Sequence, residues 1–205
     1  MSYWRHFDKK RLECYFQRGF GTCNKKGAPL ERGALRRDAV STTVSTRRTH
    51  LTINRTKSFD PSDFIDHTGW TIWRGPADGS GREGEEQQCK EGLALSSIDL
   101  AKVRLVTCLK GKEIAVDGEE FIRRLKDGGR PRLDAQVLET LLKNQNFIPN
   151  TWKRRKKVCF TGTELRTSGG YRYILFLYWD GTQWGSDYEW LNHNFDADTP
   201  AAVGG

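Results

Sequence analysis

The residues of this sequence best suited to binding a ligand are a run of five consecutive cations and an aromatic segment that follows it. The run is Lys153–Lys157, and five of the nine residues in 171–179 are aromatic. Cations neutralise backbone phosphates and aromatic rings stack on bases, so the combination predicts a nucleic-acid-binding surface. The candidate cations of this region are Lys153, Arg154, Arg155, Lys156, Lys157 and Arg172, and the candidate stacking rings are Tyr171, Tyr173, Tyr178, Trp179 and Trp184.

The first 57 residues form a second basic region. They hold 14 Lys and Arg against four Asp and Glu, a balance of +10, so residues 58–205 carry −2 of the chain's total of +8. Repeated glycines and a Ser/Thr-rich tract predict a disordered arm, which would add salt-dependent affinity for RNA or DNA. The arm's candidate phosphate-binding residues are Arg5, Arg11, Arg18, Arg36, Arg37, Arg47 and Arg48. Two other interpretations stay open: a solvated extension without a partner, and a misassigned translation start, since Met1 is the only methionine.

Motifs of known enzyme and cofactor sites do not occur in the sequence. Without a phosphate-binding glycine loop, a nucleophile elbow or a metalloprotease motif, we expect no cofactor and favour a protein that is not an enzyme. The five cysteines are scattered, which predicts neither a zinc site nor a disulfide framework and favours a cytoplasmic location. Because no apolar run approaches about 18 residues, we also expect no membrane partner. A metal-dependent nuclease that uses His193, Asp196 and Asp198 is a third hypothesis.

The elements that would position these side chains predict an α+β fold. Strands are expected at 158–165, 171–179 and 183–191, joined at Asp180-Gly181 by a short hairpin and forming an antiparallel meander. Two short helices, at about 118–126 and 134–145, have N-cap and C-cap signals and are expected to pack across one face of this sheet. We therefore predict a basic arm at 1–57 and a domain at 58–205, with its aromatic β module at 152–195.

The strand at 171–179 is apolar on both faces. Tyr171, Tyr173 and Trp179 are expected to point to one side, and Ile174 and Tyr178 to the other. Such a strand is either covered on both faces, or it buries one face and exposes an aromatic platform. An exposed platform without the cations would equally suit a protein-interaction or carbohydrate-recognition module, which is the main alternative to nucleic-acid binding.

Three stretches of the sequence resemble parts of other proteins, namely 148–152, 160–163 and 177–181. Together with the ending Pro200-Ala201-Ala202, they make residues 60–203 similar to uncharacterised conserved proteins of uncultivated bacteria that have a Trp-rich C-terminal segment. The resemblance implies a shared C-terminal module. It implies no activity, site or partner, and it does not extend to the basic arm.

Overall fold

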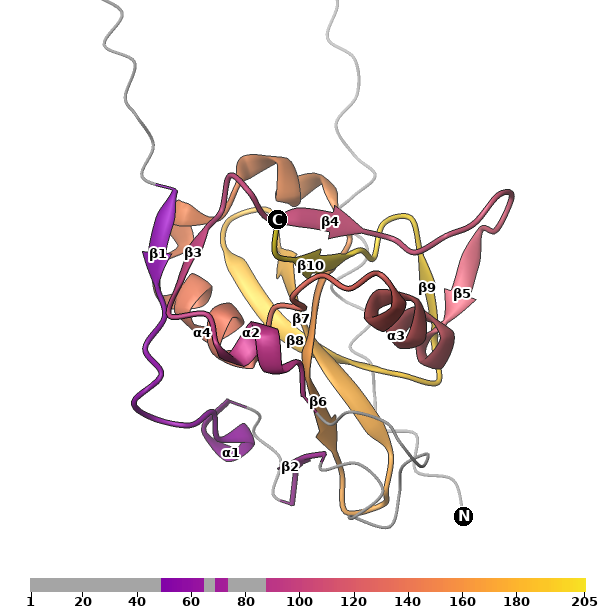
Figure 1. Ribbon diagram of the computed structural model, residues 1–205, viewed down its shortest axis with the longest axis horizontal. Coiled ribbons are helices and arrows are strands. Elements are labelled where there is room, and N and C mark those ends of the chain that lie inside the picture. Colours follow the sequence, from indigo (N-terminus) through magenta and orange to yellow (C-terminus); the bar gives the residue numbers. More distant parts are fainter. Residues whose placement is uncertain (1–48, 65–68, 74–87) are drawn as a thin grey trace, which may run out of the picture. The chain divides into compact units, whose positions relative to one another are not determined.

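The computed structural model describes residues 49–64, 69–73 and 88–205, which form an α+β fold (Figure 1). All seven candidate cations of the arm, Arg5 to Arg48, lie outside these residues. Within the described part, no helix is long and apolar enough to cross a membrane.

The main sheet has six strands in the order β4-β10-β6-β7-β8, with β2 paired to β6 (Figure 1). All of its pairs are antiparallel except that of β10 with β6. The three longest strands lie where the sequence predicts them, because alternating apolar residues and a tight turn determine both their length and their pairing. The bounds are β2 (Thr71–Ile72), β4 (Arg104–Val106), β6 (Val158–Arg166), β7 (Arg172–Trp179), β8 (Trp184–Trp190) and β10 (Ala201–Val203).

Two small antiparallel pairs complete the strands. The first joins β1 (His50–Thr52) to β3 (Ser97–Asp99), and the second joins β5 (Ala115–Asp117) to β9 (Asn194–Asp196). Short helical turns lie between them: α1 (Pro61–Phe64), α2 (Lys90–Leu93), and the 3-10 turns η4 (Gln145–Phe147) and η5 (Asn150–Arg154).

The folded domain begins earlier than residue 58, the boundary expected from the charge pattern. Leu51 and Ile53 are buried in its core, and Arg55 ties the same segment to the domain. The Arg55 guanidinium donates to Asp134 Oδ2 at 2.6 Å and to the Gly92 carbonyl at 3.0 Å. Composition alone assigned these residues to the arm, because their burial depends on partners more than 35 positions away in the chain.

The two longest helices begin at the residues that the sequence predicts. In α3 (Gly118–Asp127), Asp117 caps the first turn by accepting from the Glu120 N–H at 3.1 Å. In α4 (Ala135–Lys143), Asp134 accepts from the Val137 N–H at 3.0 Å. Each carboxylate satisfies an amide that the helix itself leaves without a partner.

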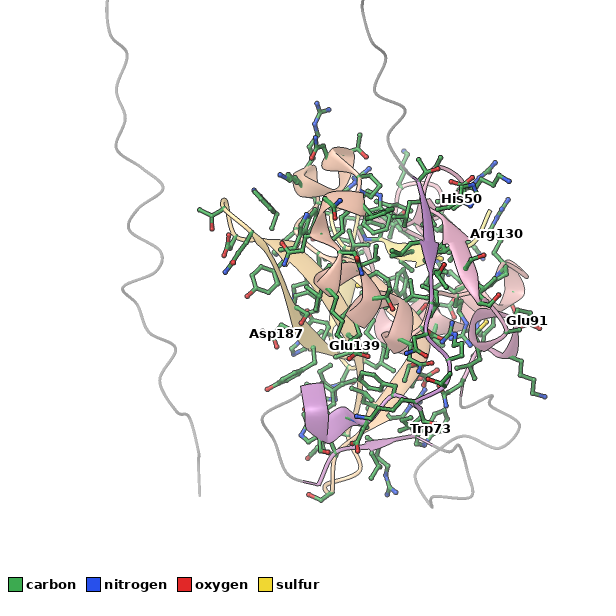
Figure 2. The ribbon with its side chains drawn as sticks, turned by 90° about the vertical axis from the view of Figure 1, so that its left-hand side faces the viewer. His50, Trp73, Glu91, Arg130, Glu139 and Asp187 are labelled. Atoms are coloured by element: carbon green, nitrogen blue, oxygen red, sulfur yellow. The ribbon has the colours of Figure 1, made fainter. Side chains whose placement is uncertain are left out.

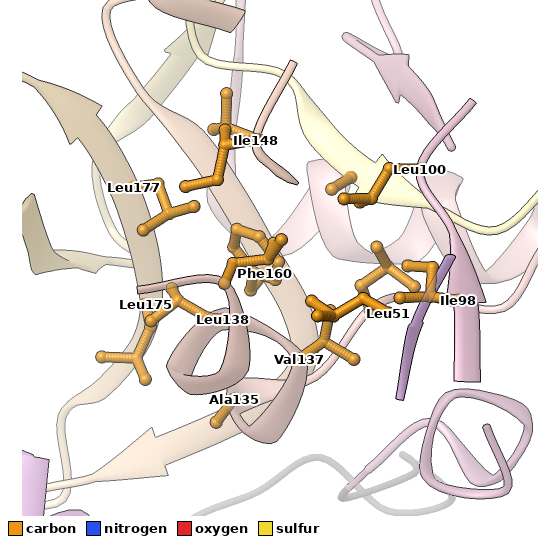
Figure 3. Close-up of a cluster of buried hydrophobic side chains, with 14 of the residues drawn as sticks. Leu51, Ile98, Leu100, Ala135, Val137, Leu138, Ile148, Phe160, Leu175 and Leu177 are labelled. Carbon is orange, nitrogen blue, oxygen red and sulfur yellow. The ribbon is translucent and has the colours of Figure 1, made fainter. Parts of the chain in front are cut away.

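These helices pack on opposite faces of the main sheet, which corrects the expectation that both cover one face. The core around α4 contains Leu138 and Leu141 together with Leu175 and Leu177 of β7 (Figure 3). The core around α3 contains Phe121, Ile122 and Leu125 together with Ile174 and Phe176. A central strand that is apolar on both sides has to be covered on both sides, and one helix serves each face.

Candidate nucleic-acid interface

A buried tryptophan positions the basic run on the surface. Trp152 lies in η5 with only 3% of its surface exposed, packed in the core that also holds α4. The turn is closed on both sides of this residue, since the Trp152 N–H donates to the Pro149 carbonyl and the Arg155 N–H donates to the Trp152 carbonyl. Trp152 anchors the turn in the core, whereas Lys153, Arg154, Arg155 and Lys156 are all exposed.

One of these cations lies on an aromatic ring. Lys153 Nζ is 3.5 Å from the ring centroid of Trp179 at the end of β7. Trp179 is half-buried and packs edge-on against Trp184, with ring centroids 5.5 Å apart. A cation held over a tryptophan face is stabilised by the ring while its charge still faces solvent. Lys153 and Trp179 therefore present a positive charge and an aromatic ring side by side.

The cations of the run differ in how far nearby carboxylates neutralise them. Lys157 is half-buried in an ion pair with Glu189, and burial lowers the pKa of Lys157. Arg155 lies 3.9 Å from Asp198 Oδ1 and donates to the Ala197 carbonyl. Among the described residues, no carboxylate forms an ion pair with Lys153, Arg154 or Lys156. These three cations are the part of the run that is available to an anionic partner.

Arg172 lies in the interior, so it does not belong to this surface. It is 8% exposed, and its Nη1 donates to both Glu119 carboxylate oxygens, at 2.9 and 3.0 Å. Its Nη2 donates to Glu164, and the guanidinium lies 4.0 Å from the ring centroid of Trp73, which is labelled in Figure 2. The sequence placed Arg172 among surface cations, whereas its charge is used to pair acidic groups from β6 and α3.

Glu164 is the centre of this buried charged group, and sequence reasoning missed it. Its side chain is 1% exposed, with Lys126 Nζ at 4.0 Å and Arg132 Nη1 at 3.9 Å in addition to its bond with Arg172. Burial raises the pKa of Glu164, and Arg172 opposes that shift. The available signal was a charged residue inside an otherwise apolar strand, which is costly unless cations lie beside it.

The five candidate rings do not form one exposed platform. Tyr171 is 55% exposed, but Trp184 is 4% exposed, and Tyr178 lies on the opposite face of β7 from Tyr173 and Trp179. Tyr173 is also covered in part by Trp70, whose ring centroid is 4.7 Å away. Among the five candidate rings, Trp184 is therefore buried in the core, Tyr173, Tyr178 and Trp179 are partly buried, and Tyr171 is exposed.

The residues of the nuclease hypothesis do not meet at a metal site. Within the described residues, no three His, Cys, Asp or Glu side chains are arranged to hold a metal ion. His193 Nδ1 instead lies 2.6 Å from Glu189 Oε1. Asp196 accepts from the Asp198 N–H at 2.9 Å and from the Thr199 hydroxyl at 3.1 Å, which closes a turn before β10.

Comparison with known proteins assigns no family to the chain. No family model, no curated protein and no solved structure matches it. The resemblance of residues 60–203 to uncharacterised bacterial proteins therefore stays a prediction.

Proposed function

We propose that this protein binds nucleic acid without catalysing a reaction, through the adjacent ring of Trp179 and an η5 surface formed by Lys153 and Arg154 of η5 and Lys156 just after it. The observation that carries the proposal is a group of three exposed cations, Lys153, Arg154 and Lys156, that form no ion pair with a carboxylate of the described residues and that closely follow the buried Trp152. A turn anchored in the core keeps its charges at fixed spacing. Little backbone order then has to be gained on binding.

Phosphate contact explains this arrangement better than sugar binding does. An oligosaccharide site needs rings and hydrogen-bonding groups but no group of cations, whereas each cation that meets a phosphate releases a counterion. When Lys153 moves from the ring of Trp179 to a phosphate, the ring face that it covered would stack on an adjacent base. The same contacts fit RNA and DNA, because phosphates do not distinguish them.

The arm at 1–57 is included in the proposal on sequence grounds. Its balance of +10 would add affinity that depends on salt but not on base sequence. The cytoplasmic location expected from the scattered cysteines also belongs to the proposal.

Fluorescence anisotropy with labelled mixed-sequence oligonucleotides, at about 50 and 200 mM salt, tests this function. For the triple variant Lys153→Gln/Arg154→Gln/Lys156→Gln, we expect weaker binding and a log–log salt slope that is shallower by about 2 to 3, since each phosphate contact contributes about 0.9. The matched control replaces three exposed lysines elsewhere, Lys90→Gln/Lys102→Gln/Lys143→Gln. Equal affinity and slope in the two triple variants, or no salt-sensitive binding by the wild type, would refute the proposal.

A further inference from the structure

The segment between β4 and β5 projects from the domain (Figure 1), and it carries an exposed isoleucine, Ile114. Ile114 is 88% exposed, the highest value among the large apolar side chains of the described residues, followed by Tyr171 at 55% and Leu93 at 37%. A single exposed apolar side chain is ordinary on a protein surface. The hydrogen bonds that hold the backbone around Ile114 are what distinguish this one.

Reciprocal hydrogen bonds close the turn just before Ile114. The Glu113 N–H donates to the Lys110 carbonyl at 3.0 Å. In return, the Lys110 N–H donates to Glu113 Oε2 at 2.9 Å. Gly111 lies between them with φ +55°, in the left-handed region that glycine adopts without strain. The turn is therefore fixed by its own backbone and by the side chain of Glu113.

Arg124 of α3 holds the same turn from the body of the domain. It donates to Glu113 Oε1 at 2.9 Å, to Glu120 Oε1 at 2.7 Å, and to the Cys108 carbonyl at 2.9 Å. Cys108 has φ +59° and is the only non-glycine residue with positive φ among the described residues. A conformation of this kind persists where the surroundings impose it, and such positions gather at binding and switch sites.

The charge around Ile114 is positive. Lys110 and Lys112 are exposed on the turn, and among the described residues neither forms an ion pair. The one acidic residue of the turn, Glu113, is neutralised by Arg124. Ile114 is therefore an exposed apolar side chain that directly follows a hydrogen-bonded turn, and the two exposed lysines lie two and four residues before it in the chain.

From this geometry we infer that Ile114 is an apolar wedge that enters duplex DNA between two base pairs from the minor groove, with Lys110 and Lys112 on neighbouring phosphates. The inference rests on the proposed nucleic-acid binding and adds duplex DNA as the ligand. Proteins that kink DNA insert apolar side chains in this way, and a wedge has to be stiff because stacked bases resist it. Insertion into a membrane needs no stiff backbone and gains little from a single side chain. The turn that Arg124 holds in place therefore favours DNA as the partner.

The experiment measures DNA bending and binding separately with the full-length chain. The probe is a duplex of about 25 base pairs with a central TA step, which kinks readily, and with a donor and an acceptor dye at its ends. We expect the wild type to raise energy transfer, and Ile114→Ala to abolish this rise while changing affinity less than about threefold. Ile114→Leu should restore bending, because leucine is also an effective wedge. The matched control, Leu93→Ala, should bend the duplex as the wild type does.

A second variant tests the two lysines. Lys110→Gln/Lys112→Gln should weaken duplex binding and make the salt slope shallower by about 2.

The outcomes separate this inference from the proposed function. Salt-sensitive binding without bending, or bending that Ile114→Ala leaves unchanged, overturns the wedge and leaves the η5 surface standing. If the protein binds single strands but no duplex, the wedge is also overturned and the η5 surface still stands. If phosphatidylglycerol vesicles sediment the protein in an Ile114-dependent way while the duplex stays straight, Ile114 is a membrane contact instead. If the wild type binds no nucleic acid at all, both proposals fail.

Discussion

Replacing Arg172 with methionine tests the buried charged group most directly. Arg172→Met keeps the approximate length and apolar stem of the side chain but removes the cation that donates to Glu164. Glu164, with 1% of its side chain exposed, then keeps Lys126 and Arg132 as its nearest cations among the described residues, at 4.0 and 3.9 Å. Glu119 also loses its partner, but its side chain is 29% exposed and water can solvate it.

The expected loss of stability in Arg172→Met depends on how strongly the folded state favours protonated Glu164. Burial already raises the pKa of Glu164 above its ordinary value of 4.5, and loss of Arg172 removes the largest opposing influence. In the variant the folded state therefore favours the protonated form of Glu164 more strongly than the wild type does, whereas the unfolded chain releases that proton above pH 4.5. Removing one partner of a buried ion pair costs about 3–5 kcal/mol, so we expect a loss of about 3 kcal/mol at pH 7 and a smaller loss at pH 5, where Glu164 is protonated at less cost.

The direction of the pH dependence distinguishes loss of the Glu164–Arg172 ion pair from a general packing defect. Because the pKa of Glu164 is raised in the folded state, its contribution to stability is greatest below pH 4.5, and the loss caused by Arg172→Met grows as the pH rises from about 4.5. Urea unfolding at pH 5 and pH 7 measures the difference. A loss at pH 7 of about 3 kcal/mol corresponds to a melting temperature about 6–12 °C lower for a domain of this size.

A double variant provides the control. Arg172→Met/Glu164→Gln removes the titrating group together with its partner, so its stability should change little between pH 5 and pH 7, and it should exceed that of the single variant at pH 7. The reasoning is wrong if Arg172→Met loses less than about 1 kcal/mol at pH 7, or if its loss relative to wild type is the same at both pH values.

Three further predictions concern the scaffold. Asp134→Ala removes both the α4 cap and the partner of Arg55, so chemical denaturation should show a loss of about 2–3 kcal/mol, against about 1 kcal/mol for Asp117→Ala, which removes only a cap. A Cβ at Gly162 would lie 2.4 Å from the Arg132 carbonyl oxygen, so Gly162→Ala should cost about 2–3 kcal/mol and lower the melting temperature; an unchanged value would contradict this contact. Hydrogen bonds from Arg124 lower the pKa of Glu113 to about 2. Glu113 therefore contributes stability above pH 4.5 that is lost as the pH falls towards 2, and carbon NMR titration should show its midpoint move back towards 4.5 in Arg124→Gln.

The sequence was most informative where structure depends on near neighbours. Asp180-Gly181 predicts the tight connection between β7 and β8, and Asp117 and Asp134 predict the starts of α3 and α4. These features follow from turn geometry and from unsatisfied amides within three or four positions. The same local information identified Lys153–Lys157 as a run of cations, four of which are exposed.

Pairings between distant segments depended on the tertiary structure. Strand β10 lies between β4 and β6, although residues 201–203 carry no distinctive strand pattern. The charge of Arg172 looked like part of a binding surface, but it meets Glu119 and Glu164, 53 and eight residues away.

The sequence could not separate buried from exposed cations because residue type fixes a charge, whereas the fold decides whether water solvates it. Residue types fix the charge of Arg172 and of Lys156 equally. The packing of α3 on the sheet buries Arg172 among carboxylates. Lys156, close to the buried Trp152, stays exposed to water. Sequence by itself determined which groups the chain has and where its main strands and helices begin. The tertiary fold decided which of those groups face a partner.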